Sequence, residues 1–211
     1  MNVVVTRPAN RAAGLVARLE ALGHQVAVHP LIETEPLGDA PVDVDGYDWV
    51  IVTSRTGAEE LRRRMRGRPQ RVAAIGAATA EALGGADLVP TVATQEGLLA
   101  ELPRPAGRVL FAGAEDARRL LADELDAEFV PLYRTRRLAP EGFPEGADVV
   151  VLASASAAEA YAALGIGTPA VSIGPQTSAA ARAGGVRILA EAATHDVDGL
   201  VEAISRCSSH S

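Results

Sequence analysis

Short apolar runs rich in β-branched residues alternate along the chain with segments of helical periodicity. Residues 12–22 typify the helical segments, because Leu15, Leu19 and Leu22 recur at i, i+4 and i+7 and predict one apolar helix face. Strands that alternate with amphipathic helices indicate βαβ units, so the pattern predicts an α/β fold with parallel sheets. The predicted strands are 3–6, 25–29, 49–53, 72–75, 87–89, 109–111, 128–131, 149–153, 171–173 and 187–189.

The chain repeats itself at an offset of about a hundred residues. DWVIVTSRTGAE at 48–59 returns as DVVVLASASAAE at 148–159, and AIGAAT at 74–79 returns as SIGPQT at 172–177. Self-similarity at a fixed offset indicates copies of one structural unit, and only two copies indicate paired domains rather than a solenoid. Two facing domains would form a cleft, which is the expected place for a ligand.

A third repeated phrase, PLIET at 30–34 and PLYRT at 131–135, marks where the chain passes between the domains. The segments 32–38 and 132–138 leave a strand through proline, threonine and charged residues without starting a helix. We therefore predict that these two segments are inter-domain crossovers lying side by side.

These crossovers define a discontinuous first domain, 1–35 plus 138–211, with a second domain, 38–132, inserted in it. The first domain has two predicted strands before the insertion and three after it, whereas the inserted domain has the equivalent three first and the equivalent two last. The second domain is thus predicted to be a circularly permuted copy of the first. Five strands fit a flavodoxin-like, doubly wound parallel sheet in each domain.

Composition narrows the class of protein. A hydrophobic content of 48% with 22% charged residues is ordinary for a globular protein, and no apolar run approaches the length of a membrane span. The N-terminus lacks the pattern of a signal peptide, and the single cysteine, Cys207, excludes an internal disulfide framework. We expect a cytoplasmic monomer. The net charge of −7 argues against nucleic-acid and membrane-surface partners.

Candidate binding residues follow the predicted strands directly. In doubly wound sheets a ligand binds beyond the carboxyl ends of the strands, where free N–H groups at helix N-termini favour anions and glycine lets the backbone approach. The alternative is that the hydroxyl residues among them are ordinary helix caps. The residues at these positions are Arg7, Ser54, Gly76, Thr79, Gly113, Ser154, Gly174 and Thr177.

Arginines and one tyrosine add candidate chemistry. Arg7 follows the first strand, where its planar fork could hold a carboxylate. The basic cluster 62–68 is typical of a solvated helix end, and Arg134, Arg136 and Arg137 could face either the cleft or water. Tyr133 lies at a crossover, where its phenol could donate a proton to a ligand or simply pack between the strands.

Other kinds of site lack support in the sequence. There is no phosphate-binding loop, no GxGxxG after the first strand and no G-x-S-x-G elbow, so we expect neither a cofactor nor a metal. The histidines, none of which has metal-ligand spacing, are His24, His29, His195 and His210.

In their order along the chain, these motifs resemble the uroporphyrinogen-III synthase family. The matching phrases, of which no single one is specific, are VVTRP at 4–8, PLI at 30–32, VTS at 52–54, AIG-x-x-TA at 74–80, Gly113 with Arg118 and Leu120, LY-x-T at 132–135, Ser154, and IGP-x-T at 173–177.

The resemblance implies two flavodoxin-like domains joined by a two-stranded ladder, and a cofactor-independent lyase. Such an enzyme closes hydroxymethylbilane, a linear tetrapyrrole, to uroporphyrinogen III with loss of water and inversion of the terminal pyrrole ring. By the family's pattern, Tyr133 would be the general acid. Thr79, Ser154 and Thr177 would supply hydroxyls, and Arg118 would join the substrate-binding residues named above. A non-catalytic module that binds a tetrapyrrole or small anion is the alternative.

Overall fold

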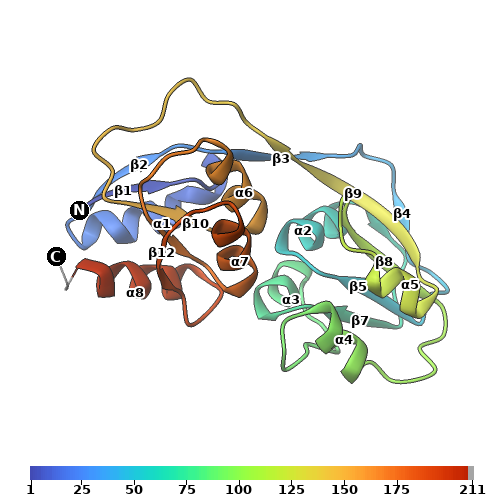
Figure 1. Cartoon of the computed structure of the whole chain (residues 1–211). Helices are drawn as coiled ribbons and strands as arrows, with labels where there is room; N and C mark the ends of the chain where they lie inside the picture. Colours follow the sequence, from blue (N-terminus) through green and yellow to red (C-terminus); the bar gives the residue numbers. More distant parts are fainter. Residues whose placement is uncertain (209–211) are drawn as a thin grey trace. The chain divides into compact units, whose positions relative to one another are not determined.

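The protein is described by a computed structural model over residues 1–208, in which two compact units can be distinguished (Figure 1). Unit 1 comprises Met1–Thr34 and Arg136–Ser211, and unit 2 comprises Glu35–Thr135. Each unit is an α/β structure built on a parallel sheet, and each is described below by itself. Within residues 1–208 no helix combines the length and the apolar character that crossing a bilayer requires.

The sheet of unit 1 has the order β12-β11-β10-β1-β2, and all of its strand pairs are parallel. Val4 lies opposite Val150 on one side and Ala27 on the other. Every residue of β10 is buried, as expected of a parallel strand covered on both faces. The strands are β1 (Asn2–Val5), β2 (Gln25–Val28), β10 (Val149–Leu152), β11 (Ala170–Ser172) and β12 (Ile188–Glu191).

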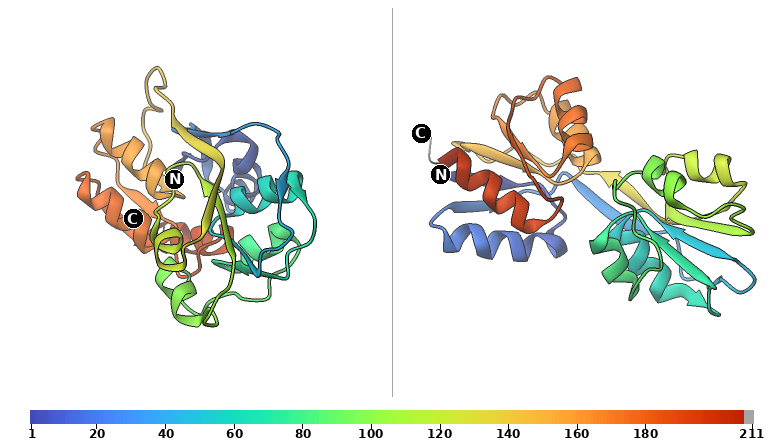
Figure 2. Two further views of the ribbon diagram at one scale, coloured as in Figure 1. Left: turned by 90° about the vertical axis from the view of Figure 1, so that its right-hand side faces the viewer. Right: turned by 90° about the horizontal axis from the view of Figure 1, so that it is seen from below.

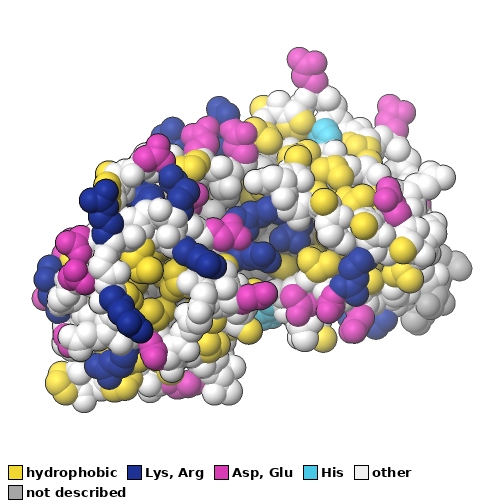
Figure 3. All heavy atoms as spheres, turned by 180° about the vertical axis from the view of Figure 1, so that it is seen from behind, with side chains coloured by type: hydrophobic (Ala, Val, Ile, Leu, Met, Phe, Trp, Pro, Cys, Tyr) yellow, Lys and Arg dark blue, Asp and Glu magenta, His cyan; other side chains and the backbone are white. Residues whose placement is uncertain are grey.

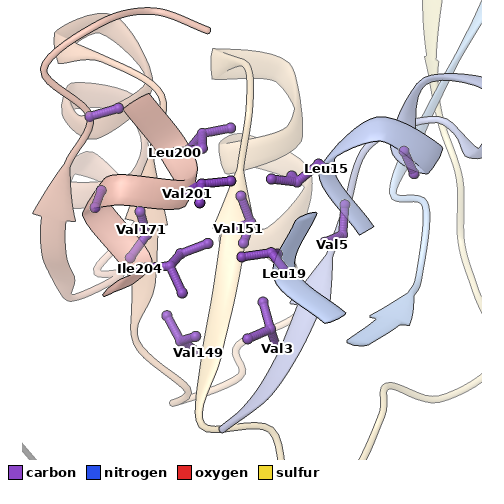
Figure 4. Close-up of a cluster of buried hydrophobic side chains, with 13 residues drawn as sticks. Val3, Val5, Leu15, Leu19, Val149, Val151, Val171, Leu200, Val201 and Ile204 are labelled. Atoms are coloured by element: carbon purple, nitrogen blue, oxygen red, sulfur yellow. The ribbon is translucent and has the colours of Figure 1, made fainter. Parts of the chain in front are cut away.

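Helices cover both faces of this sheet (Figure 2) because the strand side chains alternate in direction. On one face, Val3 and Val5 pack with Leu15, Leu19 and other aliphatic side chains from α1 and α8 (Figure 4). On the other face, Val4 packs in a cluster with side chains from α6 and α7. The helices are α1 (Ala9–Ala21), α6 (Ala155–Ala163), α7 (Pro175–Ala183) and α8 (Val197–Ser208).

The main sheet of unit 2 has the order β3-β9-β8-β5-β7. On one face lie α2 (Arg55–Arg64) and α3 (Ala77–Leu83), and on the other lie α4 (Gln95–Glu101) and α5 (Leu120–Leu125). The strands are β3 (Ile32–Pro36), β5 (Trp49–Val52), β7 (Arg71–Ala74), β8 (Val109–Ala114) and β9 (Glu128–Arg137), with β4 (Val42–Asp43) and β6 (Met65–Arg66) forming a separate pair.

The internal repeat corresponds to matching strand orders in the two sheets. By their repeated sequences, β5 is equivalent to β10 and β7 is equivalent to β11. Unit 1 then runs β2-β1-β10-β11, and unit 2 runs β9-β8-β5-β7, although β1 and β2 come first in one unit and β8 and β9 come last in the other.

Three local predictions need correction. The predicted strand 87–89 is reduced to one parallel bridge between Ala73 and Leu88, and Pro90, which has no N–H to donate, follows it. The predicted strand 128–131 continues as β9 to Arg137. Leu22 is 55% exposed rather than part of the apolar face, because α1 ends at Ala21 and Gly23 turns the chain with a positive φ.

The two segments that connect the units are hydrogen-bonded neighbours, as strands β3 and β9. The Leu37 N–H donates to the Leu132 carbonyl at 2.9 Å, and the Leu138 N–H donates to the Leu31 carbonyl at 2.9 Å. The two connecting segments are therefore joined to each other by backbone hydrogen bonds.

Candidate active site

The predicted site residues lie at the carboxyl edges of the two sheets. In unit 2, Ser54 follows β5, Gly76 follows β7, Gly113 is near the end of β8, and Tyr133 lies in β9. Because these strands are parallel, their carboxyl ends share one edge of the sheet. In unit 1 the corresponding residues, which follow β1, β10 and β11, are Arg7, Ser154 and Gly174.

Both serines are helix caps. Ser54 Oγ accepts from the Gly57 N–H at 3.0 Å at the start of α2, and Ser154 Oγ accepts from the Ala157 N–H at 3.1 Å at the start of α6. The capping alternative raised by the sequence therefore holds for both residues. A cap uses the serine oxygen as an acceptor and leaves its hydrogen for a further bond.

Glycine is the N-cap residue of α3 and α7. It has no side chain that could accept a hydrogen bond from the first turn of the helix. Gly76 precedes α3, and a Cβ built on it would lie 4.0 Å from its nearest neighbour, Ala93 Cβ. Gly174 precedes α7, and a Cβ there would come within 2.8 Å of the His195 imidazole. Lack of room for a Cβ therefore explains why glycine stands at 174, but it does not explain the glycine at 76.

The two threonines of the Gly-x-x-Thr phrases are almost completely buried. Thr79 in α3 is 5% exposed and Thr177 in α7 is 4% exposed. Each lies in the first turn of its helix. Little of either side chain is accessible to a ligand in the structure as it stands.

Tyr133 is buried, and its phenol oxygen lies 2.9 Å from Ser54 Oγ. A register shift in the β8–β9 ladder places it there: Gly113 pairs with Pro131 and Ala114 with Tyr133, so Leu132 is passed over. Successive strand residues normally point to opposite faces, yet Leu132 and Tyr133 both enter one core cluster. This bulge turns the phenol towards Ser54.

Arg118, which precedes α5, is engaged in an ion pair with Glu96 of α4 at 2.7 Å. The hydrogen bond from Arg118 lowers the pKa of the Glu96 carboxyl to about 2. Buried Gln95 also holds this loop, because its amide donates to the Arg118 carbonyl at 3.0 Å. The sequence carries no signal for the Gln95 contact, since the two residues come from separate elements.

The three arginines of the second crossover segment are ion-paired with acidic side chains. Arg134 pairs with Glu35 at 2.9 Å, Arg136 with Glu33, and Arg137 with Glu159 at 2.5 Å. Arginines and carboxylates are accordingly interspersed over the surface seen in Figure 3. The prediction of a solvated cluster at 62–68 is wrong for Arg64, which is buried and donates to the Ala40 carbonyl at 2.8 Å.

A hydrogen-bonded chain missed by sequence reasoning supports α7. Ser172 and Ser178 are fully buried with their oxygens 2.5 Å apart, and Ser178 donates to Glu191 of β12 at 2.5 Å. Ser178 directly follows Thr177, so this chain fixes the first turn of α7 against the sheet. Among residues 1–208, His, Cys, Asp and Glu side chains nowhere gather in a group of three that could hold a metal ion.

Each of the two units is thus an α/β structure whose candidate site residues, helix N-termini and hydroxyl groups, lie at the carboxyl edge of its sheet, and unit 2 adds one buried phenol. A sequence profile described as "Uroporphyrinogen-III synthase HemD" matches residues 13–202. The chain therefore belongs to the uroporphyrinogen-III synthase family.

Relatives of known sequence agree with this assignment. A uroporphyrinogen-III synthase from Synechococcus elongatus is 26% identical, with 97% of this chain and 94% of the relative covered. A putative uroporphyrinogen-III synthase from Methanocaldococcus jannaschii is 28% identical over 159 residues, which are 69% of this chain and 65% of the relative. The match thus spans just under two thirds of the Methanocaldococcus protein.

Solved structures show the same fold. A mutant uroporphyrinogen III synthase from the extremely thermophilic bacterium Thermus thermophilus superposes with a TM-score of 0.68 over the whole of both chains, at 19% identity. The uroporphyrinogen-III synthetase from Helicobacter pylori gives a TM-score of 0.65 at 16% identity, with 98% of this chain and 99% of that chain covered.

Proposed function

We propose that this protein converts hydroxymethylbilane to uroporphyrinogen III, with loss of water and inversion of the terminal pyrrole ring. The observation that carries the proposal is the Tyr133 phenol, held 2.9 Å from the Ser54 hydroxyl at the carboxyl edge of the unit 2 sheet. Membership of the uroporphyrinogen-III synthase family supplies the reaction.

Binding would rest on backbone and hydroxyl groups more than on single charged side chains. The substrate is a polycarboxylate, and N–H groups at the starts of α2, α3, α6 and α7 suit carboxylates. Arg7 would add a positive charge at the end of β1, and Arg118 could reach a carboxylate only in competition with Glu96.

Chemistry would begin at the terminal hydroxymethyl group. Tyr133 donates its phenol proton to the leaving hydroxyl, and the C–O bond breaks with both electrons going to the departing water. A protonated azafulvene, which keeps its pyrrole N–H, and the Tyr133 phenolate remain. The last pyrrole ring is then attacked at its substituted carbon, and the resulting spiro intermediate fragments and recloses with that ring inverted. The carbon that finally closes the ring loses a proton, which restores the phenol.

Control of geometry is the remaining task of the protein. The free substrate cyclises unaided to the uninverted isomer, so the enzyme must hold a flexible molecule in one folded shape. We propose two flavodoxin-like domains, 1–35 plus 138–211 and 38–132, linked by crossovers 32–38 and 132–138, with the substrate bound in the cleft between them. A monomer in the cytoplasm that needs no cofactor completes the proposal.

Product analysis tests this function. Freshly prepared hydroxymethylbilane is incubated with the protein and, in parallel, with buffer and with heat-inactivated protein, and the oxidised porphyrins are separated by chromatography. We expect isomer III with the active protein and isomer I in both controls. Isomer I alone in every sample would contradict the proposed function.

A further inference from the structure

Ser54 and Tyr133 form a side-chain pair whose parts come from distant segments, 79 residues apart in the chain. Ser54 is the cap of α2, where its oxygen accepts the Gly57 N–H at 3.0 Å. That bond occupies an acceptor site on the serine oxygen and leaves its hydrogen free to point elsewhere. The Tyr133 oxygen, at 2.9 Å, is within the distance at which this hydrogen can be donated.

The absence of a side chain at Gly57 allows close packing around Ser54. A Cβ built on Gly57 would lie 3.0 Å from Ser54 Oγ and 3.3 Å from Val52 Cγ1. The first turn of α2 therefore sits against the end of β5 more closely than a larger residue would allow. A cap held in this way keeps the serine hydroxyl at one place.

The position of Tyr133 is fixed by its strand. The bulge at Leu132 turns Tyr133 into the core cluster that also contains Leu132, and the Leu132 carbonyl accepts the Leu37 N–H at 2.9 Å. On the following residue, the Tyr133 carbonyl accepts the Glu115 N–H at 2.8 Å. The phenol consequently reaches Ser54 from a backbone that is bonded on both sides of the bulge.

The second copy of the repeat contains the cap without the phenol. Ser154 caps α6 with the same geometry, but the repeated phrase places Ile32 where unit 2 has Tyr133. Capping alone therefore accounts for the serine in unit 1. In unit 2 the same serine has an additional polar partner.

We propose that Ser54 is a positioning residue for Tyr133: it donates its hydroxyl hydrogen to the phenol oxygen, which leaves the phenol hydrogen directed at the leaving hydroxyl. The bond also stabilises the phenolate that remains when this proton has moved to the departing water. The inference rests on the proposed function and assigns Ser54 an action through Tyr133 instead of direct contact with the substrate.

Kinetics of Ser54→Ala, Tyr133→Phe and the double variant, each made in the whole chain 1–211, test this inference. Transfer of a proton from a positioned acid contributes roughly 10²-fold or more, and losing one supporting hydrogen bond is worth about tenfold. We expect Ser54→Ala to lower kcat about tenfold with little change in KM. The double variant should be no slower than Tyr133→Phe alone, and Ser54→Thr, which keeps the hydroxyl, should restore most of the rate.

Thr94→Ala is the matched control for loss of a cap. Thr94 caps α4 through the Gly97 N–H at 3.1 Å, in the same Ser/Thr-x-x-Gly arrangement but away from Tyr133. It should lower the thermal midpoint about as much as Ser54→Ala does and leave kcat unchanged.

Four outcomes would overturn the inference. A raised KM with unchanged kcat in Ser54→Ala would mean direct substrate contact. A double variant slower than Tyr133→Phe by the full Ser54→Ala factor would mean independent action. If wild-type protein forms isomer III and Ser54→Ala is as fast, only the role of Ser54 fails, whereas wild-type protein that forms isomer I alone overturns this inference and the proposed function together.

Discussion

Gly174 packs against the imidazole of His195 so closely that a Cβ on the glycine would come within 2.8 Å of both Cδ2 and Nε2. The contact joins the start of α7 to the loop that precedes α8, two segments at the carboxyl edge of the unit 1 sheet. The backbone of Gly174 is extended, with φ of 169°, so any residue could adopt this conformation. Only the space taken by the ring argues for glycine at this position.

Replacing Gly174 with alanine should therefore be tolerated much better than the same change at Gly184. His195 is exposed and can rotate away, so Gly174→Ala should cost less than about 1 kcal/mol of the free energy of unfolding. At Gly184 the new methyl would overlap Ala162 Cβ between α7 and α6, which cannot move alone, and the cost should be about 1–3 kcal/mol. Urea denaturation of both variants measures the difference, and equal losses would contradict the packing argument.

Tyr133→Phe removes one oxygen from a buried side chain and leaves the ring in its core cluster. We expect turnover to fall about 10²-fold because the general acid is lost, while affinity for the product uroporphyrinogen III stays nearly unchanged. Single-turnover kinetics and product-binding titration separate these two effects. Tyr161→Phe, which removes a phenol bonded to the Thr168 carbonyl at 2.7 Å, is the matched control and should keep the wild-type rate. An unchanged rate in Tyr133→Phe would remove this residue from the mechanism.

Acid should weaken the contact between α4 and the loop before α5. Arg118 lowers the pKa of Glu96 from 4.5 to about 2, so the pair contributes stability that is fully present above the unfolded pKa and is lost as pH falls through the folded one. The thermal midpoint of wild-type protein should exceed that of Glu96→Gln near neutral pH. This gap should narrow between about pH 4.5 and pH 2. Raising the salt concentration should shrink it too, since both side chains are more than half exposed.

Arg64 should be more important for stability than its neighbours in the basic cluster. Its guanidinium is buried and donates to the Ala40 carbonyl, so Arg64→Met would leave that acceptor without its bond and cost about 1–3 kcal/mol of unfolding free energy. Arg62→Met, on the exposed side of α2, should change it by less than about 0.5 kcal/mol. Equal effects in chemical denaturation would show that burial of Arg64 contributes nothing.

Hydrophobic patterning predicted the elements of this protein well where a strand is buried on both faces. The runs at β5 and β10 are unbroken apolar segments, and both were predicted at the correct place. The ends and pairing of strands were predicted less accurately. The bridge at Leu88 and the extension of β9 depend on partner strands that the hydrophobic pattern alone does not reveal. Leu22 was wrongly assigned to the apolar face of the helix, because the helical spacing of leucines continues past the residue at which the helix ends.

Site residues were predicted by their position after strands, which places them at the carboxyl edges of the sheets. What the sequence could not show was which of them touch. The Ser54–Tyr133 pair depends on a bulge that shifts the register by one residue, and the Arg118–Glu96 pair joins elements with no sequence link. Burial of Thr79 and Thr177 is likewise a property of helix packing that a Gly-x-x-Thr phrase does not encode.

The interruption of unit 1 by unit 2 also sets the order in which the protein can be completed during synthesis. Unit 2 is continuous from Glu35 to Thr135, so all of its residues are translated before those of β10 in unit 1. Val3, Val5 and Leu15 must wait for Val149 and Ile204 before their core cluster can close. Residues translated before unit 2 are therefore buried only after it has been made, and a nascent chain halted before α8 would expose the apolar face that those residues share.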